Sequence, residues 1–224
     1  QARRVRNRSS INSREAAKFK IANISKWGPK SEAYIESRPS ADFCLFSEHH
    51  VPKGKQKAVV DSLDKQGWRC FMCSPQPRQG GVMMLVRNHI QLTHVLGSHA
   101  AYKKQTWLAL PVKIGKSTVL VVVLYMQASI GFRGVNWTAL REILYLRRLT
   151  KLPMMIAADW NNTPHELAAT GWLRQMEAVV VTADAEGTCR NGEKVIDYVV
   201  APQVLQTELK LKRDLDADWQ PHDG

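Results

Sequence analysis

The chain has 224 residues, which is enough for one domain with a large core and too few for two ordinary domains with a linker. Hydrophobic residues make up 44% and charged residues 23%, a globular balance, and no apolar run approaches the roughly 20 residues that span a bilayer, so we expect no membrane partner. The net charge of +12 favours a polyanionic partner, and nucleic acid is the first candidate.

The positive charge is concentrated at the start of the chain. Residues 1–20 hold seven basic side chains against Glu15 alone, a net of +6. We expect residues 1–17 to form a basic, disordered tail, which serves as a solvated arm, a nucleic-acid arm or a localisation signal. The start lacks the apolar stretch of a secretory signal, and four cysteines are too few for a disulfide scaffold. We therefore expect an intracellular protein, in the nucleus or the cytoplasm.

The first half of the chain mixes strand-like and helix-like runs. Strands are predicted at 18–24, 42–47, 68–74 and 81–86, and helices at 31–37 and 55–66. Gly67 follows the second helix at the position where a left-handed residue commonly ends a helix.

The second half contains the clearest pairing and capping signals. Residues 106–113 and 117–125 predict an antiparallel hairpin, and 153–158 a strand that ends at Asp159. A helix is predicted at 136–151 with Asn136 as its N-cap, and Thr163 to Glu166 form a capping box that opens another. The last strands are predicted at 193–200 and 205–212. Hairpins without strict βαβ alternation indicate an α+β fold with two sheets flanked by helices, not a Rossmann order.

Polar residues recur where apolar strands end. Asn23, Glu48 and Asp159 each follow such a run, Asn161 stands two residues further on, and Asp197 interrupts a β-branched run. Each has an ordinary structural interpretation as a turn or capping residue, although a carboxylate inside an apolar run such as Asp197 requires a partner. Together they predict a catalytic site, because rigid strand ends position functional groups well.

The chemistry of this set suits phosphate cleavage assisted by a divalent cation. Mg²⁺ prefers carboxylate oxygens and takes only one or two from the protein, so Glu48 is the candidate ligand. Asp159 is the candidate that orients or deprotonates the attacking water, and Asn23 and Asn161 supply amide donors. His222 is the candidate for stabilising phosphoryl charge, provided that a carboxylate such as Asp197 raises its pKa.

These residues resemble, in order and over about residues 18 to 224, the motifs of the endonuclease/exonuclease/phosphatase superfamily. The most specific segments are Asp159-Trp-Asn161 and Ile196-Asp197-Tyr198. The others are Ile21-Ala-Asn23, Phe46-Ser-Glu48, Gly80-Gly81-Val82, Leu124-Tyr125, Thr188-Cys-Arg190 and Pro221-His222. The resemblance departs at Pro221, where the family has an Asp that commonly helps to bind metal, and at Ala158 and Ser47, where it has Gly and Gln.

The resemblance implies a four-layer α/β sandwich of two mainly antiparallel sheets flanked by helices. It implies a Mg²⁺ or Mn²⁺ requirement with Glu48 and Asn23 at the metal, and Tyr125 reaching the phosphate. Because the chain ends two residues after His222, it also implies a domain over 18–224 that is truncated at its C-terminus and lacks the last core strand. We expect a monomeric domain that is part of a longer polypeptide.

The predicted function is a Mg²⁺-dependent phosphodiester hydrolase, an endonuclease acting on nucleic acid, with DNA as the favoured partner. Two alternatives remain open at this point. One is a phosphatase acting on a small or lipid phosphate, and the other is a catalytically degenerate member that binds nucleic acid.

Overall fold

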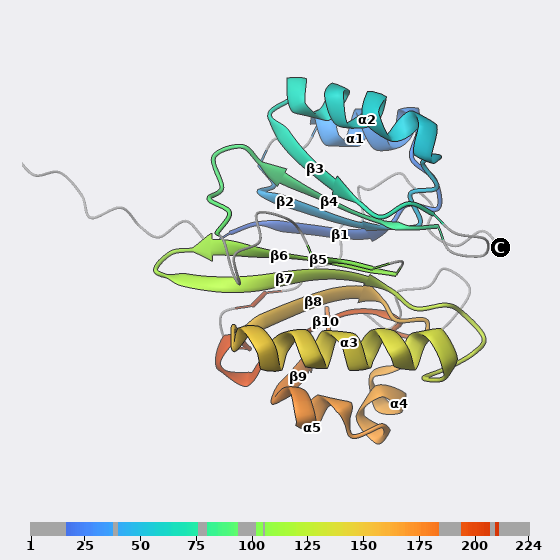
Figure 1. The fold of residues 1–224 in the computed structure, drawn as a ribbon, viewed down its shortest axis with the longest axis vertical. Helices are drawn as coiled ribbons and strands as arrows, with labels where there is room; N and C mark the ends of the chain where they lie inside the picture. The colour runs from blue at the N-terminus through green and yellow to red at the C-terminus, as the bar shows by residue number, and fades with distance from the viewer. Residues whose placement is uncertain are drawn as a thin grey trace, which may run out of the picture.

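Two β-sheets lie face to face, and helices cover the outer face of each sheet (Figure 1). The computed structural model describes residues 17–37, 40–75, 80–93, 102–104, 106–183, 194–206 and 209–210. Helices α1 and α2 lie on one side, and α3, α4 and α5 on the other, which gives four layers. The predicted α+β sandwich is therefore confirmed.

The first sheet has four strands in the order β1-β2-β4-β3. Their bounds are β1 Phe19–Asn23, β2 Phe43–Ser47, β3 Trp68–Met72 and β4 Val82–Arg87, and the outer helices are α1 Pro29–Ser37 and α2 Lys53–Lys65. β1 and β2 run parallel, whereas β4 pairs antiparallel with both β2 and β3. Both parallel strands therefore end at the same edge of the sheet.

The second sheet has six strands in the order β5-β6-β7-β8-β10-β9. Their bounds are β5 Tyr102–Lys103, β6 Trp107–Ile114, β7 Ser117–Tyr125, β8 Met154–Asp159, β9 Ala178–Val181 and β10 Asp197–Pro202. The helices are α3 Gly134–Thr150, α4 Pro164–Ala169 and α5 Trp172–Met176, and a 3₁₀ turn, η1, spans Gln203–Leu205. Only β7 and β8 run parallel in this sheet. Each sheet is thus mainly antiparallel and contains one parallel pair.

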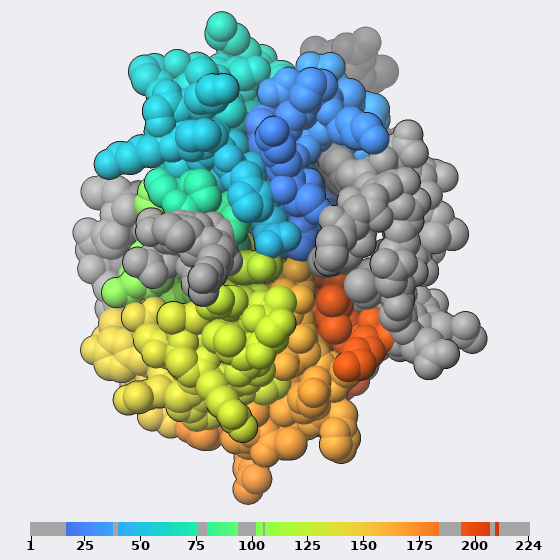
Figure 2. All heavy atoms as spheres, turned by 90° about the vertical axis from the view of Figure 1, so that its right-hand side faces the viewer, coloured from blue at the N-terminus to red at the C-terminus, as the bar shows by residue number. Residues whose placement is uncertain are grey.

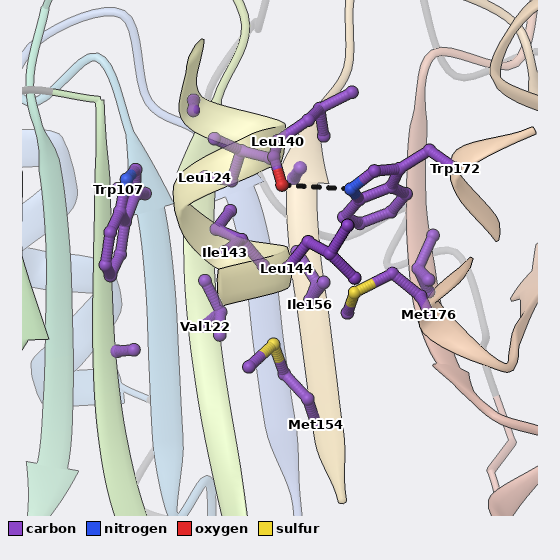
Figure 3. Close-up of a cluster of buried hydrophobic side chains, with 14 of the residues drawn as sticks. Trp107, Val122, Leu124, Leu140, Ile143, Leu144, Met154, Ile156, Trp172 and Met176 are labelled. Carbon is purple, nitrogen blue, oxygen red and sulfur yellow. Dashed lines mark hydrogen bonds between the residues drawn. The ribbon is translucent and has the colours of Figure 1, made fainter. Parts of the chain in front are cut away.

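Three apolar clusters fill the spaces between the four layers. The cluster between the second sheet and its helices includes Leu140, Ile143 and Leu144, whose spacing gives α3 one apolar face (Figure 3). In the same cluster the indole Nε1–H of Trp172 donates to the carbonyl of Leu140 at 2.9 Å, which ties α5 to α3. Alternate strand residues fill the space between the sheets, as the twofold period of a strand requires.

Most predicted elements are present within two or three residues of their predicted ends, including the hairpin, the Thr163 capping box and Gly67 after α2, with a φ of 80°. The prediction of Asn136 as an N-cap is wrong, because α3 begins at Gly134 with Arg133 as its N-cap. The strand predicted at 205–212 is also wrong where it is described, since it begins in η1. The short elements β5, β9 and α5 were not predicted.

Asn136 has a different structural role. Its buried amide accepts from the backbone N–H of Gln127 at 2.8 Å and donates to the carbonyls of Gln127 and Gly131. It thereby fixes the loop that follows β7. The predicted tail falls almost entirely outside the described residues. None of the helices in the described part of the chain is both long and apolar enough to cross a membrane.

Candidate active site

The strand ends of the two sheets meet at one end of the sandwich. β1 and β2 end there in the first sheet, β7 and β8 end there in the second, and the antiparallel β10 begins there. Figure 2 looks onto this end, where blue and cyan atoms that follow β1 and β2 meet yellow-green and orange atoms that follow β7 and β8. Polar residues at these strand ends are therefore brought together by topology.

The inward-facing positions of these strands are apolar along most of their length and polar at this end. Two residues before each strand end, the side chain packs in the cluster between the sheets. The same faces then present Asn23, Tyr125 and Asp159, and β10 begins with Asp197. The period of two that fills the core thus delivers these side chains to the gap between the sheets.

Asn23 joins the two sheets at the centre of the site. Its Nδ2 donates to Oε2 of Glu48 at 2.8 Å and to Oδ2 of Asp159 at 2.8 Å. Its Oδ1 accepts from the backbone N–H of Ser25 at 2.9 Å. Because a backbone N–H can only donate, this bond fixes the orientation of the amide. One buried NH₂ group therefore holds two carboxylates, one from each half of the sandwich.

Glu48 follows β2 in a left-handed backbone conformation, with a φ of 57°. Its backbone N–H donates to the carbonyl of Gly81 at 2.8 Å, and that of His50 donates to the carbonyl of Gly80 at 2.8 Å. A Cβ on Gly80 would lie 2.5 Å from the Cα of Glu48, so only glycine fits there. The close approach of these two chain segments sets the position of the Glu48 carboxylate.

The side chain of His49 holds this turn in place through two hydrogen bonds. The imidazole is fully buried, its Nε2–H donates to the carbonyl of Cys73 at 2.8 Å, and its Nδ1 accepts from the N–H of Val51 at 3.0 Å. Burial lowers the pKa of His49 to about 4, so the ring is neutral at pH 7. The backbone carbonyl of His49 accepts from the N–H of Trp27 at 2.8 Å, which links the loop after β2 to the loop after β1.

Tyr125 ends β7 directly beside Asp159 in the parallel register. Burial raises the pKa of its phenol, and a hydrogen bond to Glu48 and the negative charges of Glu48 and Asp159 raise it further. The hydroxyl therefore remains protonated and donates to the Glu48 carboxylate.

Asn161 fastens the turn after β8, with a φ of 49° that Asn tolerates better than most residues. Its backbone N–H donates to Oδ1 of Asp159 at 3.2 Å, and its Nδ2 donates to the carbonyl of Met126 at 2.8 Å. It thus ties the ends of β7 and β8 together and supports Asp159.

Asp197 stands directly opposite Asp159 in the antiparallel register of β10 and β8. Directly opposed residues project from the same face, and both aspartates are among the residues that line one narrow pocket between the sheets. The last predicted site residue, His222, lies outside the described residues, as do Pro221 and Thr188. The structure therefore brings together all the predicted site residues that it describes.

Two contributors to the site were not assigned by the sequence. His49 and Gly80 touch no proposed reacting group, yet they fix the backbone from which Glu48 projects. The paired glycines at 80 and 81 were a signal of close backbone approach. Nothing in the sequence separated the buried His49 from the exposed His50 beside it.

The oxygen atoms at the site are of the kind that a hard cation prefers. Glu48 and Asp159 offer carboxylate oxygens on either side of one amide, and no lysine or arginine among the described residues forms an ion pair with Glu48. The described residues contain no cluster of three acidic, His or Cys side chains that could hold a metal ion by itself. Mg²⁺ does not need one, because it usually takes one or two carboxylates and completes its shell with water and phosphate.

The chain was compared with known protein families, curated proteins and solved structures. No protein-family model matches the chain, and no curated protein matches it in sequence. Solved structures do match. An AP endonuclease from Leishmania major has a TM-score of 0.64 at 13% identity, over 92% of this chain and 85% of its own. The endonuclease domain of TRAS1, a telomere-specific non-LTR retrotransposon, has a TM-score of 0.63 at 13% identity, over 85% and 86%.

A third match is the 3′ phosphatase NExo from Neisseria, bound to a product DNA hairpin. It has a TM-score of 0.62 at 14% identity, over 93% of this chain and 96% of its own. Identities this low show the fold alone. The fold of this chain is that of the endonuclease/exonuclease/phosphatase superfamily, as its motifs predicted.

Proposed function

We propose that the chain is a Mg²⁺-dependent phosphodiester hydrolase that acts on nucleic acid as an endonuclease. The observation that carries the proposal is the Asn23 amide, which holds Glu48 and Asp159 at 2.8 Å each across the junction of the two sheets. Two carboxylates held this close are electrostatically costly, and a divalent cation relieves that cost.

The residues divide the work between orientation and proton transfer. Glu48 is the proposed ligand of the ion, with Tyr125 donating a hydrogen bond to its carboxylate. Asp159 orients the attacking water and accepts its proton, and Asn161 keeps that carboxylate in place. We retain Asp197 and His222 as the pair that stabilises phosphoryl charge.

The role of Asn23 follows from which of its atoms faces the site. Its oxygen is engaged by Ser25, and its nitrogen faces the carboxylates. This arrangement favours one role for Asn23, that of a donor that positions the two carboxylates. It does not favour the metal-ligand role that was predicted from the sequence. An Asn23→Asp variant tests the choice, because it keeps an oxygen ligand at position 23 and removes the NH₂ group that donates to both carboxylates. A donor role predicts loss of activity, and a ligand role predicts retention.

The ion supplies Lewis-acid polarisation of the phosphoryl oxygens and a water with a lowered pKa. Mg²⁺ is the ion that members of this superfamily typically use, and Mn²⁺ shares its preference for oxygen ligands. Nucleic acid is favoured as the substrate by the net charge of +12. The names of structurally similar proteins, among them two endonucleases and a DNA-bound phosphatase, agree with that choice.

The test is incubation of the full chain with supercoiled plasmid and with abasic-site DNA, in Mg²⁺ and in EDTA. We expect nicking that requires the ion and is lost in Asp159→Asn. Release of inorganic phosphate from inositol phosphates without nicking would instead assign a phosphatase. Binding of DNA without turnover, equal in the wild type and Asp159→Asn, would assign a degenerate binding protein.

A further inference from the structure

Lysines are concentrated on one side of the site. Lys26 follows β1, Lys30 opens α1, and Lys53 and Lys55 open α2, and all four side chains are exposed. We call this set the lysine strip. The loops that carry it are joined by the hydrogen bond from Trp27 to the carbonyl of His49, so the four lysines belong to one surface. Figure 1 shows that both helices begin at the end of the sandwich where the site lies.

The opposite side of the site differs in charge. The loops after β7 and β8, residues 126–133 and 160–163, carry Arg133 as their only charged residue. Among these described loops, the positive charge is therefore concentrated over the first sheet, with four lysines against Arg133 over the second. This asymmetry would be unnecessary if the lysines served only to raise the net charge.

Folding stability does not explain the lysines. The first turn of α2 contains no acidic residue, although carboxylates are favoured there and cations are disfavoured by the helix dipole. Within the described residues, none of the four lysines of the strip forms an ion pair, whereas Lys57, one turn further along α2, pairs with Asp61 at 2.6 Å. These exposed lysines, without an ion-pair partner among the described residues, are available to bind an anion.

We infer that the lysine strip binds the backbone of the nucleic-acid strand that flanks the scissile phosphate, an inference that rests on the proposed function. A small ester with a single phosphate places that phosphate in the proposed site at Glu48 and Asp159. Such an ester has no further phosphate for the lysines on the loops that surround the site. A polynucleotide carries a phosphate on every residue and releases counterions as each is neutralised. The strip therefore selects a polymeric substrate over a small phosphate ester.

The test compares two pairs of lysines on the full chain. Lys53→Gln/Lys55→Gln removes two charges of the strip. Lys65→Gln/Lys116→Gln removes two exposed charges elsewhere, since Lys65 lies twelve residues along α2 from Lys53, about 18 Å away, and Lys116 lies in the β6–β7 turn. Binding of a labelled oligonucleotide is measured by fluorescence anisotropy in EDTA, as a function of salt. This readout needs no turnover.

The slope of log K against log salt is negative, and we expect the strip variant to reduce its magnitude by about 1.4–1.8. This corresponds to the loss of two phosphate contacts at about 0.7–0.9 each. The control pair should leave the slope at the wild-type value. Equal slopes in the two variants, or an unchanged slope in both, would overturn the inference.

Turnover separates this inference from the proposed function. In Mg²⁺, the ratio of kcat/KM for an oligonucleotide to kcat/KM for bis(p-nitrophenyl) phosphate, a small diester, should fall in the strip variant and not in the control. If the wild type cleaves neither substrate yet binds through the strip, the proposed function fails and only nucleic-acid binding by the strip stands. If both substrates are cleaved and the ratio is unchanged, the inference fails and the proposed function stands.

Discussion

The two halves of the sandwich bring their site residues into place by different means. In the C-terminal half, residues 102–206, Asp159 and Tyr125 end regular neighbouring strands, and strand register sets them side by side. In the N-terminal half, residues 17–93, Glu48 stands in a left-handed turn that depends on Gly80 and His49. Sheet pairing holds the Asp159 carboxylate in position, whereas the position of the Glu48 carboxylate depends on the packing of a left-handed turn.

The difference indicates where activity is vulnerable. Changes that never touch a carboxylate should still disable the N-terminal half, because left-handed backbone persists only where its surroundings enforce it. In the C-terminal half, an effect of that size is expected from changes to the reacting groups and to Asn161, which supports Asp159.

The largest expected effect is in the C-terminal half, at the reacting group. Asp159→Asn keeps the shape of the side chain and removes the proposed base, so kcat should fall by about 10²–10⁴-fold. The Tm should change little, because the relief of repulsion from Glu48 offsets the loss of one of the two hydrogen bonds that Asp159 accepts, from Asn23 or from the N–H of Asn161. Steady-state kinetics and a thermal melt measure both. A rate close to wild type would refute the role of Asp159.

Gly80→Ala is the corresponding substitution in the N-terminal half. The new Cβ would lie 2.5 Å from the Cα of Glu48, so the turn must shift, at a cost of about 1–3 kcal/mol in stability and with a large loss of activity. Gly54→Ala is the control, since nothing lies within 4 Å of its Cβ. Chemical denaturation and hydrolysis assays compare the two. Equal behaviour of the two variants would show that the close approach at Gly80 is unimportant.

His49→Ala removes the anchor of the same turn. It leaves the Cys73 carbonyl and the Val51 N–H buried without their partner, which should destabilise the fold by about 2–4 kcal/mol. His89→Ala, at an exposed ring, should change stability by less than about 0.5 kcal/mol. Urea denaturation resolves a difference of this size. A His49 variant as stable as the His89 variant would contradict the anchoring role.

The smallest expected effect lies far from the turn, in the cap of α4. The backbone N–H and hydroxyl of Thr163 donate to Glu166 and lower the pKa of that carboxyl. A lowered folded pKa stabilises the protein above the unfolded value of 4.5, and the contribution is lost as pH falls. Glu166→Gln should therefore lower the Tm slightly at pH 7, and the difference should narrow below pH 4.5. A difference in Tm between wild type and variant that stays constant from pH 7 to below pH 4.5 would show that the ionised Glu166 carboxylate does not stabilise the cap of α4.

The same contrast between the halves explains how much the sequence predicted. Apolar periodicity and capping residues located the strands and helices that matter, and the polar residues at strand ends predicted the set around Asn23, because parallel strands end at one edge. Asn136 was misread as an N-cap, because nothing local indicates that its amide turns back to the β7 loop. The role of His49 depends on Cys73, a contact across 24 residues that no local pattern encodes.

The central claim is that carboxylates from both halves form one catalytic unit. A double-mutant cycle of Glu48→Gln and Asp159→Asn, read as Mg²⁺-dependent cleavage of DNA, tests it most directly. Groups that act as a unit are strongly non-additive, so the double variant should be about as slow as the slower single variant. Independent, multiplicative losses, or a single variant that cleaves at the wild-type rate, would contradict the account.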